Sequence, residues 1–260
     1  IPMEAKPFAM GVRIEHLQEN IDKAQYGRHD PALPPADYKL VKHLENETVY
    51  TFCMCPGGYV VAAASEDGRC VTNGMSYADR DGVNANAALL VTLNPRDFPG
   101  EGALSGMYWQ EEIEEAAFRT GGSNYHAPAQ LVGDFLNGVP SAGPGSVQPT
   151  YRPGVTWCDL RSVLPEKLVT ALKEAIPKLD GSLKGFSDPD AVLAGKVVLW
   201  PVGINLEGYQ KIMERTDVWQ GYYNTIIYTV VTVVRSLLVT IPAGWALSRE
   251  TLPGKKFWMV

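Results

Sequence analysis

Hydrophobic residues form one long stretch near the C-terminus of the chain. Residues 222–247 carry a single formal charge, that of Arg235. A helix of this length, at about 1.5 Å per residue, is longer than a hydrocarbon core of about 30 Å. Tyr222 and Tyr223 at its start and Trp245 near its end match the aromatic belts of membrane helices. The stretch predicts one transmembrane helix over 222–247, and the arginine and lysines after it place its C-terminal side in the cytoplasm.

A buried element of a soluble core is the alternative for this stretch. Its valines, threonines and isoleucines also suit a β-strand. Arg235 at the middle of a bilayer costs about 2.5–3.5 kcal/mol. We therefore expect Arg235, in a membrane helix, to face other helices and not lipid.

Shorter hydrophobic periods upstream predict a different kind of structure. Apolar residues three and four apart indicate helices, most of them ended by a glycine or begun by a proline. They cover 16–24, 106–120, 128–136 and 165–176. Apolar runs indicate strands near 6–15, 38–41, 48–52, 59–64 and 87–93, with a hairpin turn at Glu66-Asp67-Gly68. Strands and helices that do not alternate regularly predict an α+β fold, a mixed sheet with helices.

The balance of charges and the pattern of hydrophobic residues change at the same place, near residue 195. The 260 residues carry a formal charge of −6, which argues against a nucleic-acid partner. Up to residue 195 there are 16 Lys and Arg against 25 Asp and Glu, and after it 7 against 4. The sequence therefore predicts two parts of different physical class, residues 1–195 and residues 196–260.

A turn rich in cysteine and glycine is the most distinctive local feature. It reads Cys53-Met-Cys55-Pro-Gly57-Gly58. On a regular strand both thiols point to one face, and this spacing does not suit zinc, so we predict no metal site. The thiols serve either as small buried hydrophobes before a bend, or as part of a place where Gly57 and Gly58 let the backbone approach a flat ligand.

Several polar residues elsewhere have both a structural and a functional interpretation. Asn124 and Gln130 supply donors and acceptors to a ligand, or else belong to a turn and a helix start. The four histidines have no acid or second ligand at useful spacing, and we expect them at the surface. The glutamates of residues 111–115 are expected on a solvated helix face.

Six segments of the first part resemble the family of uncharacterised FAD-dependent dehydrogenases. The strings Cys-Met-Cys-Pro-Gly-Gly and Asn-Tyr-x-Ala-Pro-Ala-Gln are specific to this resemblance. The segments are Lys6–His16, Leu33–Lys39, Val49–Tyr59, Val71–Ser76, Ala127–Leu136 and Tyr151–Gly154. The Gly-rich turn with which such proteins hold FAD in a Rossmann-type domain does not occur in this sequence.

The resemblance implies a domain that covers the flavin on the substrate side. It implies FAD as cofactor, hydride transfer with a small-molecule substrate that is not identified, and a cytoplasmic parent protein. By position, it points to a flavin-facing wall made by Cys55, Gly57, Gly58, Asn124 and Gln130. No catalytic residue is implied, and we expect the isolated chain to be colourless.

The second part resembles the early portion of a carbohydrate ABC transporter permease. The resemblance lies in Leu199–Pro201, Asn205–Tyr209, Trp219–Thr225, Leu247–Arg249 and Leu252–Gly254. It implies an external segment, one membrane helix and a cytoplasmic turn, without the later helices or the loop that docks on an ATPase.

The junction near Gly195 and Lys196 has no polar linker, which is unusual for a domain boundary. Three interpretations therefore stay open: part of an oxidoreductase, part of a transporter, or an accidental fusion with no activity of its own. In each, the chain as it stands is expected at a membrane through residues 222–247.

Overall fold

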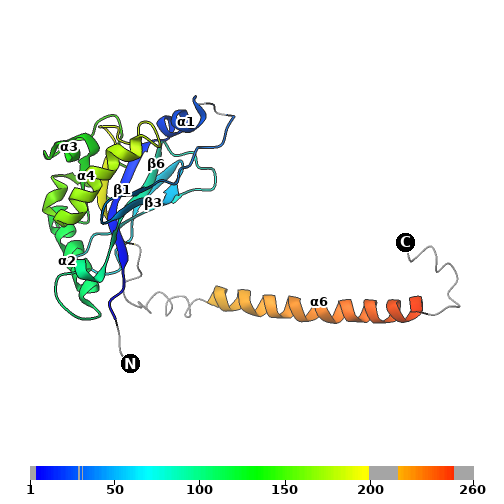
Figure 1. Cartoon of the computed structure of the whole chain (residues 1–260). Helices are drawn as coiled ribbons and strands as arrows, with labels where there is room; N and C mark the ends of the chain where they lie inside the picture. Colours follow the sequence, from blue (N-terminus) through cyan, green and yellow to red (C-terminus); the bar gives the residue numbers. More distant parts are fainter. Residues whose placement is uncertain (1–3, 29, 31, 199–215, 249–260) are drawn as a thin grey trace. The chain divides into compact units, whose positions relative to one another are not determined.

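A computed structural model describes residues 4–28, 30, 32–198 and 216–248 (Figure 1). The chain divides into two compact units, residues 1–202 and 203–260, and each is described by itself. The first unit is built from a mixed sheet with helices, and the second contains one apolar helix. The predicted α+β class is confirmed.

The first unit is organised around a seven-stranded sheet with the order β2-β3-β6-β1-β9-β7-β8. Neighbouring strands are antiparallel except β7 and β8, which are parallel. A separate hairpin pairs β4 with β5. The strands are β1 (Phe8–Leu17), β2 (Val41–His43), β3 (Thr48–Cys55), β4 (Gly58–Ala62), β5 (Thr72–Ser76), β6 (Asn84–Leu93), β7 (Ala127–Leu131), β8 (Val155–Trp157) and β9 (Val192–Val198).

Helices cover one face of this sheet and form the main core with it (Figure 1). They are α1 (Gln18–Tyr26), α2 (Ser105–Thr120), α3 (Val132–Asn137) and α4 (Glu166–Asp180), with short 3₁₀ turns at Pro95–Asp97 and Leu160–Ser162. Val12 and Ile14 of β1 pack in the same cluster as Leu168 and Leu172 of α4, all fully buried. The buried apolar face of α4 continues to Leu179. Because these residues pack in the core, the helix extends past Pro177 and beyond residue 176, its predicted end.

One predicted helix is wrong. Residues 128–136 were expected to form a single helix, but β7 occupies Ala127–Leu131 and α3 begins only at Val132. Ala129 lies opposite Ala194 of β9, and all of β7 except Leu131 is buried. Periodicity cannot separate a short buried strand from a helix, and here sheet pairing decides.

Strand β9 crosses the predicted domain boundary. It runs to Val198, where it pairs with Met10 of β1. Gly195 inside this strand has φ +58°, and a Cβ at this position would lie 2.2 Å from Thr72 Cγ2. The sheet therefore includes residues on both sides of the change in charge and texture at residue 195.

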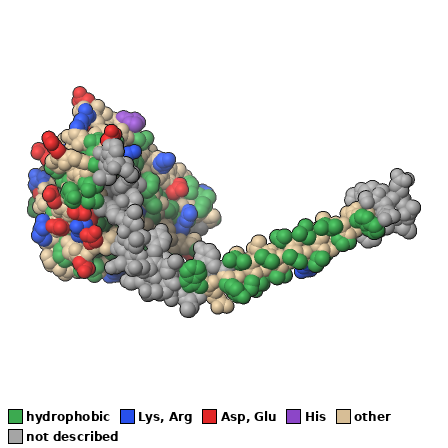
Figure 2. Space-filling view, turned by 90° about the horizontal axis from the view of Figure 1, so that it is seen from below, with side chains coloured by type: hydrophobic (Ala, Val, Ile, Leu, Met, Phe, Trp, Pro, Cys, Tyr) green, Lys and Arg blue, Asp and Glu red, His purple; other side chains and the backbone are tan. Residues whose placement is uncertain are grey.

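The second unit contains α6 (Thr216–Ser248), which is 33 residues long. Its described apolar side chains are exposed, from 40% for Ile227 to 71% for Tyr228 (Figure 2). Among the described residues, one span is long and apolar enough to cross a membrane: Trp219–Pro242, with a mean hydropathy of 1.7. Core helices of soluble proteins meet the same criterion of length and composition.

Candidate functional site

Two charged residues lie at the centre of the sheet, on the face away from the main core. Arg13 and Glu15 of β1 alternate with the core residues Val12 and Ile14, so their side chains project to the other face. Neither is exposed. The β4–β5 hairpin covers them: a Cβ on Gly74 would lie 1.9 Å from Arg13 Nη2. A glycine is required there for the hairpin to approach the guanidinium.

Arg13 is held by the polypeptide around it, and no carboxylate of the described residues forms an ion pair with it. Its Nε donates to Asn86 Oδ1 at 2.8 Å, and its Nη2 donates to the carbonyl of Cys53 at 2.7 Å. Nη2 also contacts Cys55 Sγ at 3.2 Å. Within the described part of the chain, Nη1 has no hydrogen-bond partner. Burial lowers the pKa of Arg13, while the neighbouring cysteines oppose this shift.

Glu15 is bound to the segment that follows the α3 helix. Thr150 Oγ1 donates to Glu15 Oε2 at 2.6 Å, and Asn84 Nδ2 donates to the same oxygen at 3.0 Å. Thr150 Oγ1 also accepts from the amide of Val60 at 2.8 Å, which joins this loop to the hairpin. Burial raises the pKa of Glu15, and the hydrogen bonds from Thr150 and Asn84 oppose the shift.

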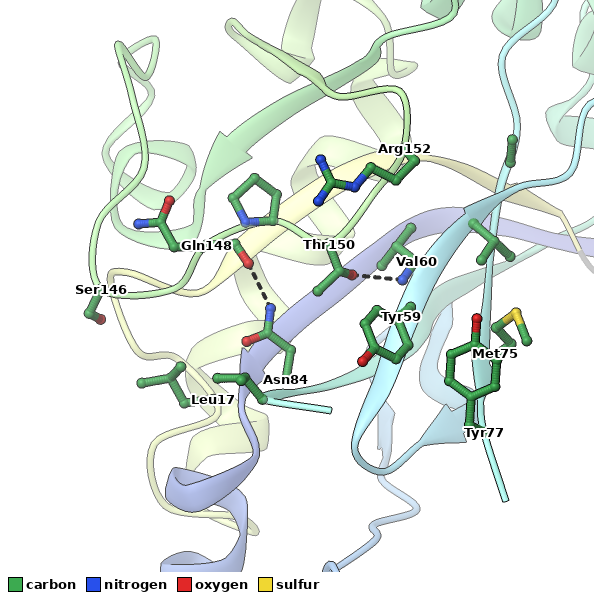
Figure 3. A pocket seen from close by; sticks show the side chains of 14 residues that line it. Leu17, Tyr59, Val60, Met75, Tyr77, Asn84, Ser146, Gln148, Thr150 and Arg152 are labelled. Carbon is green, nitrogen blue, oxygen red and sulfur yellow. Dashed lines mark hydrogen bonds between the residues drawn. The ribbon is translucent and has the colours of Figure 1, made fainter. Parts of the chain in front are cut away.

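A cavity of about 640 Å³ lies over these partners of Glu15 (Figure 3). Most of its lining is apolar, with Tyr59 and Tyr77 in an edge-to-face pair whose ring centroids are 5.5 Å apart. Val83 and Tyr77 are 75% and 60% exposed, respectively, although both are large apolar side chains. The lining residues are Leu17, Tyr59–Ala62, Met75, Tyr77, Val83, Asn84, Ser146, Gln148–Thr150 and Arg152. Its size and its mixture of apolar and polar groups are those of a small-molecule site.

A smaller cavity of about 390 Å³ adjoins the first through Tyr77, which lines both. Its lining includes Cys55, Ser76 and Arg80. Burial raises the pKa of the Cys55 thiol, and the Arg13 guanidinium opposes the shift. The expectation that Cys53 and Cys55 share a face is wrong, because Cys53 is exposed and Cys55 is buried. A bulge between Phe52 and Cys55, with Cys53 at φ +48°, breaks the alternation of the strand.

Three of the five predicted wall residues lie together. Cys55, Gly57 and Gly58 form the turn between β3 and β4. Gly57 has φ +49°, and a Cβ there would lie 1.8 Å from the carbonyl oxygen of Arg80. Gly58 approaches the carbonyl of Met75 in the same way, at 2.6 Å. In the described residues these glycines approach other parts of the same chain, and their predicted approach to a flat ligand stays a prediction.

The two predicted amides lie elsewhere. Gln130 is fully buried in β7, where Nε2 donates to the carbonyl of Val139 at 2.6 Å and Oε1 accepts from the amide of Leu160 at 2.9 Å. Asn124 is exposed, and its Oδ1 accepts from the amide of His126 at 3.0 Å. Neither residue lines either of the two cavities.

Two expectations about surface residues are wrong. His16 was expected at the surface but is 1% exposed, with Nε2 hydrogen-bonded to the carbonyl of Phe186 at 2.9 Å. Its place among Phe186 and Tyr38 explains its burial, and that burial lowers its pKa. Glu114 was expected in solvent but is buried, and Gln110 donates to it at 2.8 Å.

The sequence interpretation did not single out the residues that shape this region. Arg13 and Glu15 carried a usable signal, since charges at alternate positions of an apolar strand indicate a polar group on one sheet face. Tyr59 and Arg152 lie in segments that carry the family resemblance, but no sequence pattern marked either of them, Thr150 or Tyr77 as a site residue. Among the described residues, no group of three or more His, Cys, Asp or Glu side chains is arranged to hold a metal ion.

Sequence comparisons match the first unit. Residues 7–197 match the family described as FAD-dependent protein, C-terminal domain-like. An uncharacterized protein of Clostridium beijerinckii is 51% identical over 199 residues, which cover 75% of this chain and 37% of that protein. The chain therefore spans much less than the whole length of this relative. Because the family match covers most of the chain, the chain belongs to the FAD-dependent protein C-terminal domain-like family.

Proposed function

We propose that the first unit is the substrate-side domain of an FAD-dependent oxidoreductase. The observation that carries the proposal is the cavity over Thr150 and Asn84, within the part of the chain that matches the family. FAD would supply the hydride acceptor when it is bound to the complete enzyme. This domain would bind the substrate, orient it and exclude water from it.

The residues present fit the ring end of FAD and not its diphosphate. Tyr77 and Met75 offer flat and polarisable surfaces in the cavity lining, which suits a planar ring system. The Gly-rich turn that would cradle a diphosphate is missing from the sequence. We therefore propose that another part of a longer protein, or a separate chain, holds the phosphates.

The proposed flavin-facing wall keeps Cys55, Gly57 and Gly58. Cys55 lines the smaller cavity together with Tyr77, which also lines the larger one, and Gly57 and Gly58 follow Cys55 in the same turn. Asn124 Oδ1 and both amide atoms of Gln130 are hydrogen-bonded to the chain itself, and the proposal does not depend on these two residues.

Mixing this chain with a flavin-binding partner tests the proposal. The partner is the part of the Clostridium beijerinckii relative outside the matched 199 residues, which we propose holds FAD. We expect the chain alone to be colourless, and its addition to shift the flavin absorbance spectrum because the ring exchanges water for an apolar wall. Tyr77→Ala should reduce the shift.

Tyr108→Ala is the matched control. Tyr108 of α2 is 54% exposed, close to the 60% of Tyr77, but it lines neither cavity. Stoichiometric flavin bound to the chain alone would contradict the proposal that another part of a longer protein, or a separate chain, holds the phosphates of FAD. An unchanged spectrum on mixing would contradict the proposal itself.

We further propose that α6 anchors the chain in a membrane. Its polar and small residues recur at spacings of four and three, which places them on one face of the helix. They are Gly221, Thr225, Thr229, Thr232, Ser236 and Thr240. Thr225 Oγ1 donates to the carbonyl of Gly221 at 2.9 Å, and Thr229 Oγ1 to that of Thr225 at 2.8 Å. Hydroxyls bonded within the helix are suited to an apolar environment.

The apolar face of α6 provides the test of anchoring. Val230 and Val234 lie on the side away from the threonines, and a lysine at mid-span costs about 2.5–3.5 kcal/mol. We expect the wild-type chain to stay in the membrane pellet after alkaline carbonate, and the double variant Val230→Lys, Val234→Lys to move to the supernatant. Val41→Lys with Val139→Lys, two exposed valines of the first unit, should stay in the pellet.

A wild-type chain that is monodisperse without detergent would contradict the anchor. The resemblance of residues 196–260 to a carbohydrate permease stays a prediction, because the family match ends at residue 197.

A further inference from the structure

The larger cavity contains one formal charge. Of the 14 residues that line it, Arg152 is the one Lys, Arg, Asp or Glu. Arg152 is exposed and belongs to the loop of residues 146–152 that forms one edge of the cavity (Figure 3). Its side chain therefore sets the sign of the charge that a bound molecule meets at this edge.

Arg152 has no counter-ion in the described part of the chain. No carboxylate there lies within ion-pair distance of it. Glu15, the carboxylate behind the cavity wall, receives its hydrogen bonds from Thr150 and Asn84. The guanidinium thus keeps all its donors for solvent or for a ligand.

The rest of the lining defines the body of that ligand. Leu17, Val83 and Tyr59 present carbon surface, while Ser146 and Gln148 add polar groups at the same loop as Arg152. A molecule that fits must be apolar at one end and anionic at the other. A carboxylate is ionised at neutral pH and forms a two-point contact with arginine.

We propose that this cavity binds a small apolar carboxylate, with its carboxylate on Arg152 and its apolar body against Tyr59, Leu17 and Val83. This inference rests on the proposed function for its role as an enzyme substrate, but the binding itself requires no flavin. It narrows the substrate class to organic acids whose carbon skeleton, beyond the carboxylate, is apolar.

Cinnamate and its neutral amide are suitable probes, because they differ mainly in charge. We expect the full chain in detergent to bind cinnamate at least about tenfold more tightly than cinnamamide, by calorimetry with empty micelles as blank. Arg152→Gln should remove this preference and Arg152→Lys should retain part of it. Arg80→Gln is the matched control, since Arg80 is also exposed but lines only the smaller cavity.

Three results would overturn the inference: no saturable cinnamate binding, a preference that survives Arg152→Gln, or an equal loss in Arg80→Gln. The flavin-mixing experiment separates it from the proposed function. A preference that depends on Arg152, with no flavin shift on mixing, supports the site and contradicts the oxidoreductase role. A flavin shift on mixing without cinnamate binding supports the oxidoreductase role and contradicts the carboxylate site.

Discussion

Replacing Gln130 by leucine is expected to lower the free energy of unfolding of the first unit by about 2–4 kcal/mol. The substitution keeps nearly the same volume, but it leaves the amide of Leu160 and the carbonyl of Val139 without their partners. An unpaired buried polar group loses its hydration without compensation, so most of the cost falls on the amide of Leu160, whose bond to Gln130 is buried. Thermal unfolding should show a melting temperature lowered by about 5–12 °C.

Asn124→Ala is the comparison for this variant, because the sequence assigned both amides to the same wall. Asn124 is exposed, and water can replace its contact with the amide of His126. We expect a loss of less than about 1 kcal/mol. If Gln130→Leu were as stable as the wild type but altered the flavin spectrum on mixing, Gln130 would act on the flavin and not in the fold.

The helices show what the sequence could predict. In α2 and α4 one apolar face is continuous over several turns, so the pattern alone locates them to within a few residues. β7 is different, since its five residues become a strand through pairing with β8 and β9 at a long distance in sequence. Such pairing leaves no periodic signal in so short a segment.

The cavity could not be predicted for a related reason. Its lining comes from the end of β1, the β4–β5 hairpin, the start of β6 and the loop of residues 146–152. These segments meet only because β1 and β6 are adjacent in the sheet, an order that hydrophobic patterning does not specify. The Cys-Gly turn, in contrast, is local, and it was recognisable because its residues adjoin in sequence.

The predicted boundary at residue 195 shows a further limit. Composition and charge change there, yet β9 continues to Val198 and still pairs with β1 beyond a register shift between Gly11 and Arg13. A strand at the centre of a sheet is defined by its neighbours, so a change of composition can fall inside it. The hydrophobic helix downstream was predictable because its signal is length and hydropathy, which need no tertiary partner.

The largest effect of a single methyl group is expected at Gly57. Gly57→Ala would place a Cβ 1.8 Å from the carbonyl oxygen of Arg80, where ordinary contacts begin near 3.4 Å. The backbone at Gly57 must therefore move away from Arg80. This movement would weaken two hydrogen bonds of Gly57: its carbonyl accepts from the amide of Gly82, and its amide donates to Gln18 Oε1. An alanine at φ +49° is also strained. Because both effects add, we expect the free energy of unfolding to fall by about 3 kcal/mol or more.

Gly68→Ala separates the two causes of this loss. Gly68 has φ +74°, but a Cβ there would meet nothing within 4 Å. Its free energy of unfolding should therefore fall only by the conformational cost of alanine at this φ, about 1 kcal/mol. The difference between the two variants in urea unfolding measures the steric clash. Equal losses would mean that the turn can relax around a Cβ, and the close approach at Gly57 would then be free to serve a ligand instead of the hairpin.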